Sequence, residues 1–304
     1  MRDTFIRHDC APCFVDTAMK FLLAGTNDKK KIMEGLQQVL VMLGDDFSCN
    51  GHTFLIGNKM ARFISKFLKN GDIFKEIKHR SNQLCMEMYP LLDKRYSKLD
   101  RLDEKLDFAL VAGVAGNVID VGTSGHVFKL DPDEIFQVID DINEQGFKID
   151  HREALKKLIL DDREKHFLVM LDNAGEIVFD KFLIRLLKEN QKHVTCMAKG
   201  QPIANDATFK DLKEVGIDTL CDDILLTSIA SLGYTISDND DRVIDKVNGM
   251  DVVIGKGQAN LETLSTYRDQ MQTKHVFLLS KVKCNTVAEF QGVKKGDNVI
   301  KEVL

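Results

Sequence analysis

One segment constrains the fold most: an apolar run that leads directly into an acid, an amide and a glycine before helical spacing resumes. Phe167 to Leu171 are consecutively apolar, as expected for a strand covered on both faces of a parallel sheet. Asp172 and Asn173 then lie at the carboxyl end of that strand, where open α/β sheets bind ligands. Gly175 permits a sharp turn, and Glu176 to Leu187 return to helical spacing. The segment therefore predicts oxygen ligands and helix N–H donors at one edge of a sheet.

The first hundred residues show helical spacing and no clear strand pattern. Apolar residues recur at intervals of three and four residues over Phe14 to Leu23, Ile32 to Leu43 and Met60 to Leu68, with short polar breaks between these segments. We therefore expect an N-terminal α-helical domain, a bundle or cap, over residues 1–105.

Short apolar runs beside helical stretches dominate the second half. They cover Val194 to Met197, Val252 to Ile254 and Val276 to Leu279. Strands that alternate with helices predict a doubly wound, mainly parallel sheet of the α/β class over residues 106–304. Leu102 to Asp120 fits a buried helix or a strand by periodicity, and we favour the helix.

Composition narrows the class of protein. The 304 residues are 44% hydrophobic and 29% charged, as in an ordinary globular chain of about two domains. The formal charge of -5 argues against a nucleic-acid partner. No apolar run reaches membrane-spanning length, the N-terminus lacks a signal-peptide core, and the seven cysteines are an odd number for a disulfide framework. We expect a cytoplasmic protein with reduced thiols and no membrane partner.

The first candidate site follows the strand at Phe167 to Leu171. Asp172 and Asn173 end that strand, and Glu176 and Asp180 share one face of the next helix. A purely structural alternative makes Asp172 a helix N-cap and the other acids solvated surface. That alternative gives no common reason for four oxygen-bearing side chains at one strand end. A hard cation such as Mg²⁺ or Mn²⁺ prefers such carboxylate and amide oxygens.

A second acid lies in a similar place. Asp206 follows the run Val194 to Met197, and neighbouring parallel strands end side by side, so Asp206 can reach a cation held by Asp172. Taken alone, Asp206 would more simply begin the helix near Phe209. Together with Asp172 and Asn173, it predicts a metal site with three protein ligands.

Phosphate-binding candidates follow the remaining strands. Gly257 permits close approach of the backbone to an anion, and Lys256 is placed to pair with that anion. A tight turn with an exposed lysine is the structural alternative. Asn260 stands where a dinucleotide motif has its third glycine, so the nucleotide fingerprint is weak. A lysine after the last apolar run, and an amide and a carboxylate from the ambiguous segment, are further candidates: Lys281 or Lys283, Asn117 and Asp120.

Taken in order, these motifs resemble the DUF89 family of metal-dependent damage-control phosphatases. The resemblance spans nearly the whole chain and rests on five motifs: Cys10-x-x-Cys13, Gly116 to Asp120, Asp172 to Glu176 with Asp180, Pro202 to Thr208, and Gly255 to Asn260. The CxxC pair is similar to that of one branch of the family. The resemblance implies an α-helical N-terminal part and a three-layer α/β/α part. It also implies hydrolysis of phosphate esters of small metabolites with a divalent cation.

The resemblance implies roles for single residues as well. The metal-ligand positions correspond to Asp172, Asn173 and Asp206. The substrate- or phosphate-binding positions correspond to Lys256, Asn260 and Lys283, with Lys281 as the alternative to Lys283.

A phosphate ester resists attack because its charge repels the nucleophile, so the protein must neutralise and position it. We expect Mg²⁺, Mn²⁺, Co²⁺ or Ni²⁺ to lower the pKa of an attacking water, and Glu176 or Asp180 to orient that water. Direct attack by Asp172 stays open. Ala174 stands where the haloacid-dehalogenase phosphatases carry a second aspartate, which favours the metal-activated water.

The cysteine pair has two interpretations. Cys10 and Cys13 straddle Pro12 at the start of a predicted helix, whose dipole is expected to lower a thiol pKa. Accessory metal binding or redox activity would follow from that, whereas the alternative is structural packing. Zinc needs four ligands, and the sequence shows no second such pair.

Two other functions stay open at this point. A non-catalytic regulatory module would hold a nucleotide or sugar phosphate at the same strand ends without cleaving it. A Rossmann oxidoreductase is disfavoured because the first-strand GxGxxG and the acidic ribose ligand are missing.

Overall fold

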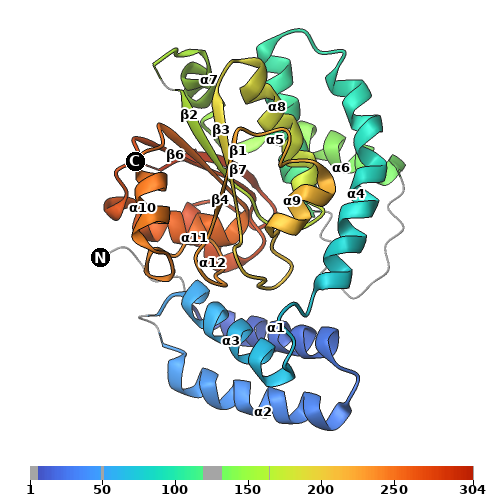
Figure 1. The fold of residues 1–304 in the computed structure, drawn as a ribbon, viewed down its shortest axis with the longest axis vertical. Coiled ribbons are helices and arrows are strands. Elements are labelled where there is room, and N and C mark those ends of the chain that lie inside the picture. The colour runs from blue at the N-terminus through green and yellow to red at the C-terminus, as the bar shows by residue number, and fades with distance from the viewer. Residues whose placement is uncertain (1–5, 49–50, 119–131, 164, 304) are drawn as a thin grey trace.

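The computed structural model of the protein describes residues 6–48, 51–118, 132–163 and 165–303 (Figure 1). Helices come first: α1 (Cys10–Gly25), α2 (Lys29–Asp46), α3 (Thr53–Leu68), α4 (Lys75–Tyr96), α5 (Leu102–Val118) and α6 (Pro132–Gln145). Strands and helices then alternate: β1 (Phe147–Asp150), α7 (Arg152–Leu160), β2 (His166–Met170), α8 (Ile177–Glu189), β3 (His193–Ala198), α9 (Phe209–Val215), β4 (Asp223–Leu226), α10 (Asp241–Asn248), β5 (Val252–Lys256), α11 (Gly257–Tyr267), β6 (His275–Lys281), α12 (Asn285–Gln291) and β7 (Asn298–Glu302).

The strands of the described chain form one sheet in the order β1-β7-β6-β5-β2-β3-β4. The five strands from β2 to β6 are parallel, whereas β7 pairs antiparallel with β6 and parallel with β1. The mainly parallel sheet that the sequence predicts is therefore confirmed. Its carboxyl edge, where β2, β3, β5 and β6 end together, is the place for a ligand site.

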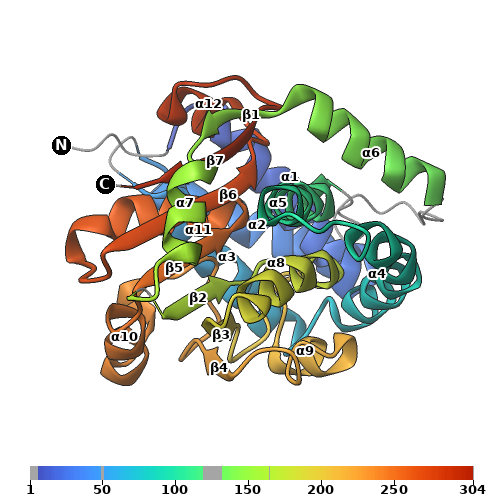
Figure 2. The ribbon, with the colours of Figure 1, turned by 90° about the horizontal axis from the view of Figure 1, so that it is seen from above.

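Burial on both faces explains why the central strands are apolar throughout. In β2, Phe167 and Val169 belong to one hydrophobic cluster, and Leu168 and Met170 belong to the other. The first cluster includes α4 to α9, and the second includes α10 to α12. Figure 2 shows α5 and α8 on one side of the sheet and α10 and α11 on the other. The three-layer α/β/α arrangement is confirmed.

A third cluster joins α1, α2 and α3 below the sheet (Figure 1). It contains Ile203 and contacts Ala230 and Leu232, which lie in the loops after β3 and β4. The three helices therefore cover the carboxyl edge of the sheet as a cap.

Helices α4 and α5 lie on the α/β side. From Cys85 onward, the buried face of α4 belongs to the core around β2 and α8. The predicted boundary between residues 105 and 106 remains a prediction, and the packing of α4 favours an earlier division. The preference for a helix over the ambiguous segment is confirmed from Leu102 to Val118. None of the described helices is both long and apolar enough to cross a membrane.

Candidate active site

Asp172 lies two residues after the end of β2 and is largely buried, with 8% of its surface exposed. The turn after it contains Gly175, whose φ of 82° is left-handed and suits glycine. The amide nitrogen of Asn173 donates a hydrogen bond to Glu176 Oε2 at 3.2 Å and lies 3.5 Å from Asp172 Oδ2. The strand end, the turn and the start of α8 thus place these three side chains next to one another.

Gly257 opens α11 and leaves room for the Asp172 carboxylate. Its φ is 76°, and a Cβ added there would lie 1.6 Å from Asp172 Oδ2. The anion that Gly257 approaches in this structure is therefore the aspartate itself. Asn260, one turn later, donates to Lys256 O at 2.8 Å and approaches Leu171 O at 3.5 Å, so its amide joins the start of α11 to the end of β2.

Backbone hydrogen bonds join the loops that follow β2 and β3. Ala207 N donates to Asp172 O at 2.8 Å, and Ala174 N donates to Asn205 O at 2.9 Å. Between these bonds, Asn173 and Asp206 form an antiparallel bridge. The structure therefore brings Asp172, Asn173 and Asp206 together, although the two aspartates are far apart in sequence.

The electrostatics of this cluster favour a cation. Burial raises the pKa of Asp172 well above its usual range, and the nearby Glu176 and Asp206 raise it further, whereas Lys283 and Lys199 lower it. Burial also raises the pKa of Asp206, and Lys199 opposes that shift. Carboxylates that share a buried site repel one another, and a bound cation relieves that repulsion.

The donor set fits a hard divalent cation. Asp206 Oδ2 is buried without a well-aligned hydrogen bond among the described residues. Two carboxylates and an amide are the ligand types that Mg²⁺ and Mn²⁺ prefer, with water and phosphate oxygens as further ligands. Across the described ranges, no three histidine, cysteine, aspartate or glutamate side chains already form a metal-binding group. The set therefore depends on Asn173 and on oxygen atoms from outside the protein.

Lys256 lies in a buried ion-pair network between the sheet and two helices. It is 1% exposed, and its ammonium donates to Gly113 O at 3.0 Å, to Glu176 Oε1 at 3.5 Å and to Asp180 Oδ1. Burial opposes its charge, but Asp180 and Glu176 outweigh that effect and raise the pKa of Lys256. Burial raises the pKa of Asp180 to about 6 against the effect of Lys256. In this arrangement Lys256 forms an ion pair with Glu176. The contact of Lys256 with phosphate remains a prediction.

Two glycines let α5 approach this network. A Cβ at Gly113 would lie 3.3 Å from both Asp180 Oδ1 and Lys256 Nζ, and a Cβ at Gly116 would lie 2.9 Å from Phe179. The last turn of α5 therefore packs directly on α8. Of the predicted substrate contacts from this segment, Asn117 lies in that turn but its side chain is outside the described part of the chain, and so is Asp120.

Lys199 is a residue of the site that sequence reasoning missed. It follows β3, is 4% exposed, donates to Gly233 O at 2.8 Å and lies 3.4 Å from Asp206 Oδ2. A signal was present, because Lys199-Gly200 ends β3 in the same way that Lys256-Gly257 ends β5. Lys283, exposed after β6, also lies close enough to lower the pKa of Asp172.

The cysteine pair lies at the joint between the cap and α12. Cys10 is buried with its Sγ 3.4 Å from Thr286 Oγ1, and Cys13 is exposed. Although Cys13 lies at the surface, partial desolvation of its side chain raises the pKa of the thiol, so the expectation that the helix start lowers a thiol pKa is wrong for Cys13. The predicted accessory metal or redox role of the pair remains a prediction.

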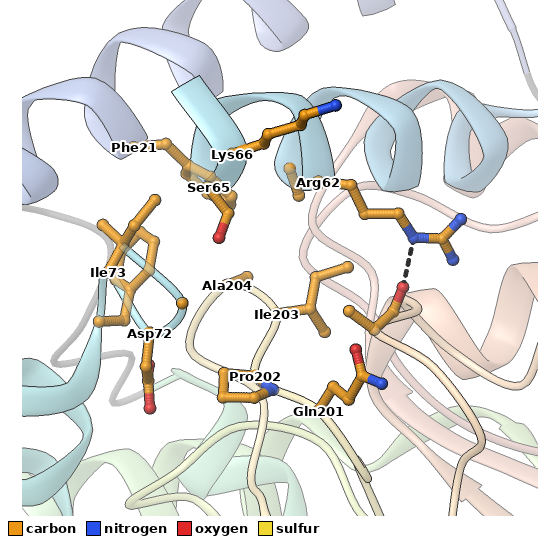
Figure 3. Close-up of a pocket in the computed structure, with 14 residues that line it drawn as sticks. Phe21, Arg62, Ser65, Lys66, Asp72, Ile73, Gln201, Pro202, Ile203 and Ala204 are labelled. Atoms are coloured by element: carbon orange, nitrogen blue, oxygen red, sulfur yellow. Dashed lines mark hydrogen bonds between the residues drawn. The ribbon is translucent and has the colours of Figure 1, made fainter. Parts of the chain in front are cut away.

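A cavity of about 440 Å³ lies beside the site, between the cap and the loop after β3 (Figure 3). Phe21, Ser65 and Ile73 line it from the cap side, and Pro202 and Ile203 line it from the loop. None of the predicted site residues lines this cavity, but its loop wall leads directly to Asp206.

Comparisons with known proteins agree with this fold. The family model of the damage-control phosphatase ARMT1-like domain matches residues 6–299. The chain is 26% identical to a damage-control phosphatase of Archaeoglobus fulgidus, over 97% of this chain and 98% of the relative. It is 27% identical to damage-control phosphatase PH1575 of Pyrococcus horikoshii, over 96% of both chains. It is 28% identical to an uncharacterized protein of Methanocaldococcus jannaschii, over 97% of this chain and 94% of that protein.

A solved structure gives the same result in three dimensions. The crystal structure of the DUF89 family protein PH1575 from Pyrococcus horikoshii superimposes with a TM-score of 0.85, at 26% identity and over 98% of both chains. The chain therefore belongs to the family of damage-control phosphatases with an ARMT1-like, or DUF89, domain.

Proposed function

We propose that this protein is a metal-dependent phosphoric monoester hydrolase that acts on small phosphorylated metabolites, such as sugar phosphates or damaged phosphometabolites. One observation carries the proposal: backbone hydrogen bonds hold Asp172, Asn173 and Asp206 together at the carboxyl edge of the sheet, beside the buried lysine Lys199. Membership of a phosphatase family, and relatives named damage-control phosphatases, support the same reaction class.

The ligand residues have distinct tasks in this proposal. Asp172 and Asp206 provide carboxylate oxygens, and Asn173 provides its amide oxygen, because its nitrogen is engaged by Glu176. A divalent cation bound there, Mg²⁺, Mn²⁺, Co²⁺ or Ni²⁺, would lower the pKa of the attacking water and neutralise a phosphoryl oxygen.

In this proposal, the remaining charged residues bind the phosphate group and orient the attacking water. Lys199 and Lys283 bring positive charge to the carboxylates from two sides, and this charge also suits the phosphate dianion. Glu176 accepts from Asn173 and is held by Lys256, so it is placed to orient the attacking water. Asp180 supports it through Lys256.

We also assign the chain to the CxxC-containing branch of the family on the basis of Cys10 and Cys13. We further propose that it acts in the cytoplasm, which its ordinary globular composition favours.

The test is phosphate release from p-nitrophenyl phosphate and from a panel of sugar phosphates, with each of the four cations and with a chelator. We expect release only with a cation, and we expect Asp172→Asn to lower it by about 100-fold or more, as for loss of a transition-state contact. Asp251→Asn is the matched control. Asp251 accepts hydrogen bonds from Lys165 N and His166 N at the opposite end of β2, so its loss affects the strand but not the site.

Three outcomes would contradict the proposal. Release that survives the chelator would reject the metal, and unchanged release by Asp172→Asn would reject the site. Binding of sugar phosphates without any release would indicate a regulatory module.

A further inference from the structure

Helix α4 has buried polar side chains where an amphipathic helix normally has apolar ones. Lys78, Ser81 and Asn82 are 2%, 3% and 0% exposed, and Cys85 and Met88 continue the same face as ordinary core residues. Buried polar groups are stable only with hydrogen-bond partners, so their partners indicate what the helix face is for.

The Asn82 side chain is bonded in two directions. Its Oδ1 accepts from Gly175 N at 2.7 Å, and its Nδ2 donates to Asp211 Oδ1 at 3.1 Å and to Glu214 Oε2 at 2.9 Å. Gly175 belongs to the turn that follows Asp172 and Asn173, whereas Asp211 and Glu214 belong to α9, after the Asp206 loop.

Asp211 links Asn82 to the end of the Asp206 loop, because its second carboxylate oxygen binds Thr208. Its Oδ2 accepts from Thr208 N at 2.8 Å and from Thr208 Oγ1 at 2.6 Å, two residues beyond Asp206. Lys78 Nζ lies 3.6 Å from the same carboxylate and 2.9 Å from Asp72 Oδ2. One face of α4 therefore contacts the Asp172 turn directly and reaches the Asp206 loop through Asp211 of α9.

We propose that Asn82 is a positioning residue for the divalent-cation site: it fixes the orientation of the Asp172 turn against α9, and so, together with the main-chain bonds between the two loops, the placement of their ligands. The inference rests on the proposed function, because it takes Asp172, Asn173 and Asp206 as the ligands. Removing the side chain leaves Gly175 N–H without its acceptor and the turn without its tie to α9, so the turn can tilt about the main-chain bonds that still join it to the Asp206 loop.

The experiment is isothermal titration of the metal-free protein with Mn²⁺, alongside kcat and KM for p-nitrophenyl phosphate. We expect Asn82→Ala to weaken Mn²⁺ binding by about 10–100-fold, as is usual when a residue that orients metal ligands is lost. Saturating Mn²⁺ should restore much of kcat in this variant, since no ligand is missing.

Asn58→Ala is the matched control. Asn58 is also a buried asparagine of an N-terminal helix, and it binds Leu232 N at 2.6 Å and Ser231 Oγ at 3.2 Å, away from the ligand loops. We expect its Mn²⁺ affinity to stay within about twofold of the wild type, although it loses a comparable set of hydrogen bonds. A similar loss of affinity in both variants would overturn the inference, because it would indicate general loosening.

A second variant guards against failure to fold. Asn82→Asp keeps the size of the side chain and an acceptor for Gly175 N–H, but places a charge beside Asp211 and Glu214. We expect Mn²⁺ binding weakened by at least about threefold, since like charges at this distance repel. Wild-type affinity in the Asn82 variants would overturn the inference and leave the proposed function standing. No binding of Mn²⁺ to the wild-type protein would overturn both.

Discussion

Gly257 is the residue at which backbone conformation and site geometry are most tightly linked. Its positive φ puts the first residue of α11 in the left-handed region, and the space where a side chain would begin is filled by the Asp172 carboxylate. The glycine therefore determines where the aspartate can lie, in addition to any contact its backbone makes with phosphate.

We expect Gly257→Ala to lower phosphatase activity about as much as Asp172→Asn, because the added methyl group forces the carboxylate away. Gly146→Ala is the control. It shares a left-handed φ, of 65°, but a Cβ there meets nothing within 4 Å. That control should lose about 1–2 kcal/mol of unfolding free energy and keep its activity. Urea denaturation and p-nitrophenyl phosphate turnover measure both effects, and an active Gly257→Ala protein would refute the linkage.

At the residue scale, the sequence reveals side chains that follow a strand and hides those that reach the site from elsewhere. Asp172 and Asp206 are visible because each comes shortly after an apolar run. Lys199 has the same position, but a lysine at a strand end is normally solvated and so carries little weight. Asn82 has no such signal, because its role depends on the packing of α4 against two distant loops.

At the element scale, the close contact of α5 with α8 depends on the absence of side chains. Gly116 faces Phe179 and the backbone of Glu176 at distances that leave no room for a methyl group. This contact is how α5, far from Glu176 in sequence, borders the network of Lys256, Asp180 and Glu176.

We expect Gly116→Ala to destabilise the protein by about 1–3 kcal/mol, as is typical of overpacking in a core. Gly44→Ala should have the opposite sign. Gly44 lies inside α2 with nothing within 4 Å of an added Cβ, so alanine gains about 0.5–1 kcal/mol from helix propensity. Urea denaturation of both variants tests the pair, and a stabilised Gly116→Ala protein would show that the α5–α8 interface can adjust.

The elements differ in how well the sequence predicts them. The apolar runs of β2, β3, β5 and β6 are long because both faces are buried, and all four are predicted. β1 and β4 lie at the sheet edges and are short and only partly buried. Lys148 interrupts the apolar pattern of β1, and β4 begins with the exposed Asp223. β7 is reversed relative to its neighbour β6, and periodicity carries no information about strand direction.

At the scale of the whole molecule, a bound cation should stabilise the fold. Without a cation, the site keeps several carboxylates buried together. An ion that binds only the folded protein therefore increases the free energy of unfolding. At a concentration 100 times its dissociation constant, that gain is about 2.7 kcal/mol.

We therefore expect excess Mn²⁺ to raise the thermal melting temperature by several degrees, and a chelator to reverse the rise. Asp172→Asn should abolish most of this shift, while Asp251→Asn should keep it. An equal shift in the Asp172 variant would place the ion elsewhere on the molecule.

The pair of hydrogen bonds that joins Ala174 to Asn205 and Ala207 to Asp172 uses only main-chain atoms. This main-chain pairing of the two ligand loops is therefore a property of peptide geometry, and the side chains at positions 174 and 207 can change without removing it. Proline is the one residue type that deletes such a donor outright. We therefore expect positions 174 and 207 to accept several small residues but not proline.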